Sequence, residues 1–127
     1  MAKSERPLSP HLQVYRPQLT STMSILHRIT GLALVAGCII LVTWLLSIAS
    51  SAECLSCFYT ACCHPLGRLM LVGISFSYFY HLFNGIRHLV WDAGYGFNLR
   101  SVYRGGYLVL ALTIGATALI WVMILNN

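Results

Sequence analysis

The stretch ITGLALVAGCIILVTWLLSIASSA, residues 29–52, decides the fold of this chain. It holds 24 residues without a charge, between Arg28 and Glu53. A helix rises about 1.5 Å per residue, so about 20 apolar residues cross the roughly 30 Å hydrocarbon core of a bilayer. Two further charge-free runs follow, of 18 residues at 69–86 and of 23 residues at 105–127. The chain is therefore predicted to be an integral membrane protein with three spans.

Helices are expected rather than strands, because a helix satisfies its own backbone hydrogen bonds in lipid. The predicted fold class is all-α, with three transmembrane helices and an N-terminal surface strap. The six expected segments are the strap (1–24), a first transmembrane helix (25–51), a cysteine-rich loop (52–65), a second transmembrane helix (66–92), a second loop (93–102) and a third transmembrane helix (103–125).

The composition agrees with a lipid bilayer as the surroundings of the chain. Only 9% of the residues are charged and 57% are hydrophobic, and the mean hydropathy is +0.72. Soluble domains average about 25% charged residues, so a soluble monomer and a disordered chain are both excluded. The eight basic residues are dispersed and form no phosphate-binding stripe, so no nucleic-acid partner is expected.

The placement of Lys and Arg predicts the orientation. With three spans, the N-terminus and the second loop share one side, which has seven cations, whereas the first loop has only Arg68. The positive-inside rule puts the seven in the cytoplasm, or in the matrix of a mitochondrion. Glu5 interrupts any acid-free presequence, which favours a bacterial inner membrane or an organelle-encoded chain, with the mitochondrial inner membrane as the alternative. The seven are Lys3, Arg6, Arg16, Arg28, Arg87, Arg100 and Arg104.

Four of the five cysteines fall in the first loop. The order Cys54-x-x-Cys57 followed by Cys62-Cys63-His64 resembles a metal-ligand set. The second well-spaced pair of a zinc site is missing, however, and the loop is short and hydrophobic. We interpret these cysteines as small apolar side chains at the membrane edge, and their pairing stays open.

A histidine lies deep in the second predicted helix. His81 is thirteen residues beyond Arg68, about 20 Å along the helix. Gly85 and His88 follow at i+4 and i+7 on the same face, and Gly85 leaves room for a flat group. Such a histidine is what an axial haem ligand requires. The alternative is a histidine that is hydrogen-bonded to a neighbouring helix.

Two polar patterns lie near the predicted helix ends. Ser24 and Arg28, four residues apart on one helix face, suit a carbonyl or anionic oxygen at the membrane interface. The alternatives are an N-cap for Ser24 and an interfacial snorkelling role for Arg28. Asp92 ends the second helix, where the helix dipole disfavours an acid, so we expect it to pair with His88, Arg28 or Arg87.

Two longer motifs contain these residues. The first is RPLSPHLQVY at residues 6–15, continued by SILHRITG at residues 24–31. The second is HLFNGIRHLVWDAG at residues 81–94, which fits the pattern His-x-x-x-Gly-aliphatic-Arg-His-aliphatic-x-aromatic-Asp-x-Gly at every defined position. Over about residues 6–125 the chain resembles the cytochrome b subunits that anchor succinate dehydrogenase, respiratory complex II, in the membrane.

The resemblance implies a cofactor, a substrate site and partners. His81 corresponds to an axial ligand of the iron of haem b, and a companion membrane subunit supplies the second ligand. Ser24 and Arg28 correspond to residues of the ubiquinone site. His27, Arg28 and His88 correspond to positions near the haem propionates. An iron–sulfur subunit and a flavoprotein subunit are expected to dock on the N-terminal side.

The implied function is electron transfer from succinate to ubiquinone in the respiratory chain and the tricarboxylic acid cycle. The subunit itself would have no catalytic centre. The alternatives are a haem-free anchor, the anchor of a related quinol:fumarate reductase, and a small subunit with a proton or ion path. An ion path needs charges at mid-depth in several helices, which the first and third helices lack. The SILHR sequence favours the succinate-oxidising form.

Overall fold

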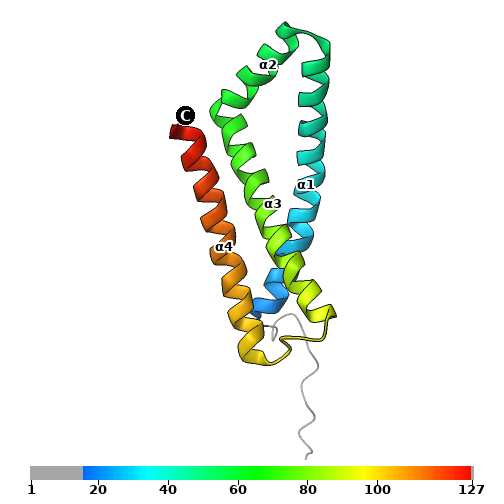
Figure 1. The fold of residues 1–127 in the computed structure, drawn as a ribbon, viewed down its shortest axis with the longest axis vertical. Helices are drawn as coiled ribbons and strands as arrows, with labels where there is room; N and C mark the ends of the chain where they lie inside the picture. Colours follow the sequence, from blue (N-terminus) through cyan, green and yellow to red (C-terminus); the bar gives the residue numbers. More distant parts are fainter. Residues whose placement is uncertain (1–15, 127) are drawn as a thin grey trace, which may run out of the picture.

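The computed structural model describes residues 16–126, and every regular element in that range is a helix. Three helices are long and apolar enough to cross a membrane, as predicted. A short fourth helix joins the first two of them at one end of the molecule (Figure 1). The helices are α1 (Leu19–Ser50), α2 (Ala52–Cys63), α3 (Pro65–Asp92) and α4 (Leu99–Asn126).

The expected cysteine-rich loop at 52–65 is instead mostly the 12-residue helix α2. Ser51 caps its start, because its hydroxyl accepts a hydrogen bond from the backbone N–H of Cys54 at 3.2 Å. Leu55, Phe58 and Cys62 recur at helical spacing and are the half-buried side chains of α2. Pro65 then forces the preceding residue into extended backbone, so α2 ends and α3 begins there.

The long helices extend beyond the predicted spans. α1 begins at Leu19 rather than at 25, and α4 begins at Leu99 rather than at 103. Charges mark where lipid ends, but an exposed arginine does not break a helix. Asn98 caps α4, since its Oδ1 accepts from the N–H of Ser101 at 2.8 Å. The N-terminal strap lies outside the described residues up to position 15.

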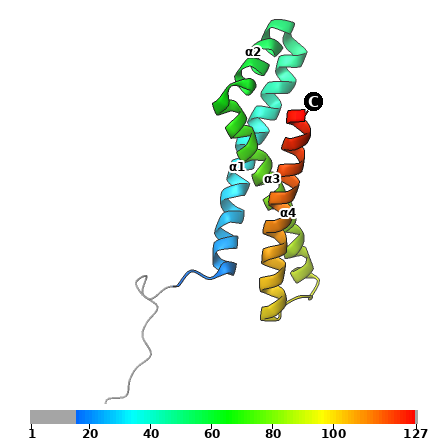
Figure 2. The same cartoon turned by 90° about the vertical axis from the view of Figure 1, so that its left-hand side faces the viewer.

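α3 is the central helix, packed against α4 along one side and against α1 on the other (Figures 1 and 2). The buried apolar side chains are few and join all three helices: Met23, Tyr80 and Val109. The Tyr80 hydroxyl donates to the Met23 carbonyl at 2.9 Å. α4 approaches closely at Gly106, where an added Cβ would lie 2.9 Å from the Met23 sulfur.

Most large apolar side chains point outward from all three long helices. A soluble protein would bury such residues, whereas lipid or a neighbouring membrane subunit covers them in a bilayer. Several polar side chains are buried instead, and they bond within the chain. Thr113 and Thr117 donate to carbonyls of their own helix, and Trp121 donates to the Ser75 hydroxyl at 2.9 Å.

Candidate functional site

His81 of α3 points at the first part of α1. Its Nδ1 lies 3.1 Å from the carbonyl oxygen of His27 and 3.3 Å from the hydroxyl oxygen of Thr30. A carbonyl oxygen only accepts hydrogen bonds, so Nδ1 carries the proton and donates it. This contact between two helices requires the close crossing of α1 and α3, which the Tyr80 hydrogen bond also stabilises.

The protonation of Nδ1 determines the chemistry of the other ring nitrogen. A neutral imidazole with a proton on Nδ1 has its lone pair on Nε2. Within residues 16–126, no hydrogen bond occupies His81 Nε2. Metal-bound histidines typically donate their other N–H to a backbone carbonyl or a similar acceptor, as His81 does here. The side chain therefore fits a haem ligand that binds iron through Nε2.

Three histidines of the sequence motifs, His27, His81 and His88, lie together. The rings of His27 and His81 stack with their centroids 3.8 Å apart and an interplanar angle of 9°. The His88 ring is 5.4 Å from that of His27, and it meets Trp91 edge-on at 5.2 Å. His27 Nδ1 is buried and has no hydrogen-bond partner among the described residues. The cluster joins α1 to the second half of α3.

Two glycines shape the surroundings of His81. Gly85 faces open space, because an added Cβ there would meet no atom within 4 Å. A flat group beside Gly85, as the sequence predicts, would need such open space. The close packing of the His81 ring depends instead on Gly31 of α1, where an added Cβ would lie 3.1 Å from His81 Cε1. Gly31 could not be assigned a role from the sequence, since its partner is fifty residues away.

Ser24 and Arg28 lie one turn apart near the start of α1. Ser24 is half-buried and Arg28 is exposed. In the described part of the chain neither side chain has a hydrogen bond or an ion pair. Both groups are therefore available to a ligand or another subunit at this end of the molecule. No hydrogen bond or ring contact within residues 16–126 joins either side chain to the three histidines.

Among the arginines within residues 16–126, Arg87 is the one that is buried, with 9% of its surface exposed. It donates to the Val102 carbonyl at 2.9 Å and to Asn84 Oδ1 at 3.4 Å. Its guanidinium carbon lies 4.0 Å from the ring centroid of Trp91. Asp92 is exposed, and the expected ion pair with a cation is not found within residues 16–126. Arg87 thus links α3 to the start of α4 rather than pairing with Asp92.

Comparison of the sequence with known proteins identifies the family of this chain. Residues 2–120 match the family described as succinate dehydrogenase/fumarate reductase transmembrane subunit. The chain belongs to this family. It is 46% identical to the succinate dehydrogenase cytochrome b556 subunit of Rickettsia prowazekii, over 94% of this chain and 93% of the relative. For the cytochrome b556 subunit of Paracoccus denitrificans the identity is 40%, over 86% and 84%.

A mitochondrial relative is similar as well. The chain is 42% identical to the succinate dehydrogenase cytochrome b560 subunit of Sus scrofa, over 87% of this chain and 67% of the relative. The predicted family is therefore confirmed. Like these relatives, the chain is a multi-pass membrane protein of the succinate dehydrogenase type.

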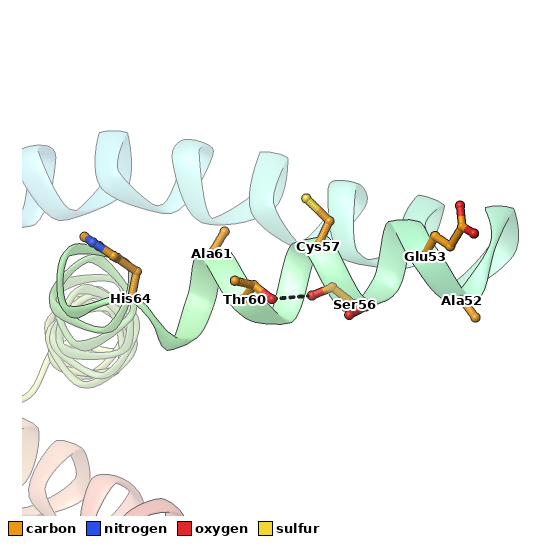
Figure 3. Close-up of a pocket in the computed structure, with 7 residues that line it drawn as sticks. All are labelled: Ala52, Glu53, Ser56, Cys57, Thr60, Ala61 and His64. Carbon is orange, nitrogen blue, oxygen red and sulfur yellow. Dashed lines mark hydrogen bonds between the residues drawn. The ribbon is translucent and has the colours of Figure 1, made fainter.

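The cysteine-rich helix α2 lies at the end of the molecule opposite the starts of α1 and α4 (Figure 1). Figure 3 shows Cys57 near the middle of α2, with Glu53 near the start of the helix and His64 just after its end. Among the described residues, no three Cys, His, Asp or Glu side chains gather as a metal site. Cys54, Cys57 and Cys63 are exposed and Cys62 is half-buried, all as free thiols.

Proposed function

We propose that this chain, as the cytochrome b subunit of succinate dehydrogenase and a membrane anchor of complex II, binds haem b through His81 Nε2. The observation that carries the proposal is the hydrogen bond from His81 Nδ1 to the His27 carbonyl, which leaves Nε2 as the basic nitrogen. A companion membrane subunit would supply the second histidine ligand. When bound, haem b would accept and release single electrons.

The surrounding residues of this chain suit the acidic edge of a haem. His27 stacks on His81, and His88 lies beside His27. Arg28, next to His27 in sequence, has a permanent positive charge. We assign His27, Arg28 and His88 to the region of the haem propionates, where imidazole N–H groups and a guanidinium would bind carboxylates.

The ubiquinone site is proposed at Ser24 and Arg28. Both side chains lack partners within the described chain and lie at the start of α1, where a lipid-soluble quinone meets the aqueous edge of the membrane. Reduction of a quinone takes two electrons and two protons and builds negative charge on its oxygens. Arg28 stabilises that charge and Ser24 donates a hydrogen bond. The protons come from the water at that edge.

The arrangement of cations supports an N-terminus on the cytoplasmic side of a bacterial inner membrane, or on the matrix side of the mitochondrial inner membrane. Four arginines of the described chain, Arg28, Arg87, Arg100 and Arg104, belong to the start of α1, the end of α3 and the start of α4. These helix ends lie at one end of the molecule (Figure 1), and Arg68 belongs to the opposite end. The iron–sulfur and flavoprotein subunits would deliver electrons from succinate on the N-terminal side.

Substitution of His81 tests this function. His81→Ala in the purified complex should remove the low-spin haem signal from the dithionite-reduced spectrum, because the iron loses one of its two ligands. His64→Asn is the matched control, since His64 is exposed at the other end of α3 and asparagine can keep its cap on the Leu66 N–H. A bis-histidine spectrum that survives His81→Ala unchanged would exclude His81 as the ligand.

A further inference from the structure

Thr30 lies at the contact between α1 and α3. It belongs to the SILHRITG motif, but the sequence alone gives it no role. It is 5% exposed, and its hydroxyl oxygen lies 2.9 Å from the Leu26 carbonyl and 3.0 Å from the His27 carbonyl of its own helix. The hydroxyl has a single hydrogen, which goes to one of these two carbonyls. Its lone pairs are then available to His81 Nδ1, 3.3 Å away.

We propose that Thr30 is a positioning residue for the haem ligand, because it accepts the Nδ1–H of His81 and so fixes the tautomer and the ring plane of that histidine. This inference rests on the proposed role of His81. The Nδ1–H is shared between two acceptors on α1, the Thr30 hydroxyl and the His27 carbonyl. If Nε2 of His81 were protonated instead, Nδ1 would have a lone pair and no hydrogen. That lone pair would then face the Thr30 and His27 oxygens without a hydrogen bond, which is unfavourable.

The same turn of α1 supplies the space that this hydrogen bond needs. Gly31 follows Thr30, and an added Cβ there would lie 3.1 Å from His81 Cε1. The His27 ring stacks on the His81 ring 3.8 Å away. His27, Thr30 and Gly31 therefore determine the position, the proton and the plane of one imidazole.

Other threonines of α1 show what a purely local role looks like. Thr22 and Thr43 also donate to the carbonyl four residues earlier, at 3.1 and 2.8 Å, but both are exposed. Thr30 makes the same local bond and adds a contact to α3, 51 residues away. Substitutions at Thr30 and at Thr43 that remove the hydroxyl therefore differ in whether the contact with His81 is lost.

The hydrogen bond has an electronic consequence for a metal bound at Nε2. Acceptors at Nδ1–H raise the basicity of the imidazole and so its donation to the iron. A more basic ligand stabilises the oxidised, more positive iron. Removal of the Thr30 oxygen leaves only the His27 carbonyl as acceptor, so the midpoint potential of the haem should rise.

The test compares three substitutions in the purified complex with all its subunits. Thr30→Val keeps the branched shape and removes the oxygen, Thr30→Ser keeps the oxygen, and Thr43→Val makes the same change at an exposed site. We expect Thr30→Val to keep haem, to raise its midpoint potential and to alter its low-spin EPR spectrum. Thr30→Ser should stay close to the unmodified complex, and Thr43→Val should be indistinguishable from it.

An unchanged potential and EPR spectrum in Thr30→Val would overturn the inference. The proposed function would still stand if His81→Ala removes the haem signal, and it fails separately if His81→Ala leaves that signal intact. If the Thr30→Val complex does not accumulate, Thr30→Ala is measured in the same way. A raised potential in Thr30→Ala supports the role of Thr30, and an unchanged one contradicts it.

Discussion

Two arginines near the same end of the molecule have opposite surroundings. Arg87 is buried and donates to groups of its own chain, so its charge holds helices together. Arg28 is exposed, and no hydrogen bond or ion pair within residues 16–126 occupies it. A guanidinium that the chain itself leaves unused is the better candidate for an anionic oxygen from outside. This contrast makes Arg28, rather than Arg87, the residue to test for quinone chemistry.

Arg28→Leu should lower quinone reduction by about 10²–10³-fold, because one preorganised electrostatic donor is lost. Oxidation of succinate with a soluble artificial acceptor should stay near the unmodified rate, since that chemistry occurs in other subunits. Ser24→Ala should give the same pattern more weakly, because one neutral hydrogen bond contributes about 0.5–1.5 kcal/mol. Both rates are measured on the same membrane preparation, with the yield of complex as a reference.

The control for this prediction is Arg100→Leu, which removes an exposed arginine of α4 at the same end of the molecule. It should leave both rates close to normal. Equal losses of both rates in Arg28→Leu at normal yield would contradict a quinone role, and a snorkelling role for Arg28 would then be preferred.

The sequence predicts some residues of the proposed site and gives no role to others, for a physical reason. His81 was recognisable because its depth along a helix follows from residue counting, and Ser24 and Arg28 because their spacing places them on one face. Thr30 and Gly31 act on a side chain fifty residues away, and only the crossing of α1 and α3 brings them there. Contacts between helices are not encoded in the periodicity of one helix.

At the scale of the element, α2 shows that the positions of charges predict membrane spans but not every helix. Charge-free runs predicted the three spans, but they do not report where a helix ends. Charges are taken to mark the loops, so residues 52–65, which hold Glu53 and four cysteines, are predicted to form a loop. The Ser51 cap and the half-buried face of Leu55 and Phe58 are what make the segment helical.

The start of α2 has a consequence for thiol chemistry. Hydrogen bonds with Ser51 and Ser50 lower the pKa of the exposed Cys54 thiol. A chain that keeps Cys54 as its sole cysteine should therefore react with a maleimide at a lower pH than an ordinary thiol, because the thiolate is the reactive form. Ser51→Ala should raise the pKa of Cys54 and move the half-point of the labelling rate to higher pH.

Ser56→Ala is the control for this labelling experiment, because Ser56 is exposed on the same helix but bonds through its carbonyl to Thr60. Its labelling curve should coincide with that of the Cys54 chain. A half-point that does not move in Ser51→Ala would show that the serine cap leaves the thiol unaffected.

At the scale of the whole molecule, the proposed haem site is only half formed by this chain. Two of the other described histidines are not placed to complete the coordination of an iron at His81 Nε2. The His27 ring stacks on the face of the His81 ring, so it does not face His81 Nε2 across an iron. His64 lies at the opposite end of α3. The apolar core is small, and most large apolar side chains face outward. If His81 binds haem as proposed, another membrane subunit would have to supply the second ligand, and it would also cover part of this apolar surface.

The chain produced without its companion membrane subunit should therefore bind haem weakly and accumulate poorly. A ligand stabilises only the folded state that binds it, so loss of the second axial histidine also removes the stabilisation that haem gives. Polar groups near His81 would face lipid without partners, which is costly in a bilayer. The measurement is the amount of membrane-inserted chain and its reduced haem spectrum, with and without co-production of the companion subunit. A stable monomer loaded with low-spin haem would contradict the prediction, because one chain would then have provided both ligands.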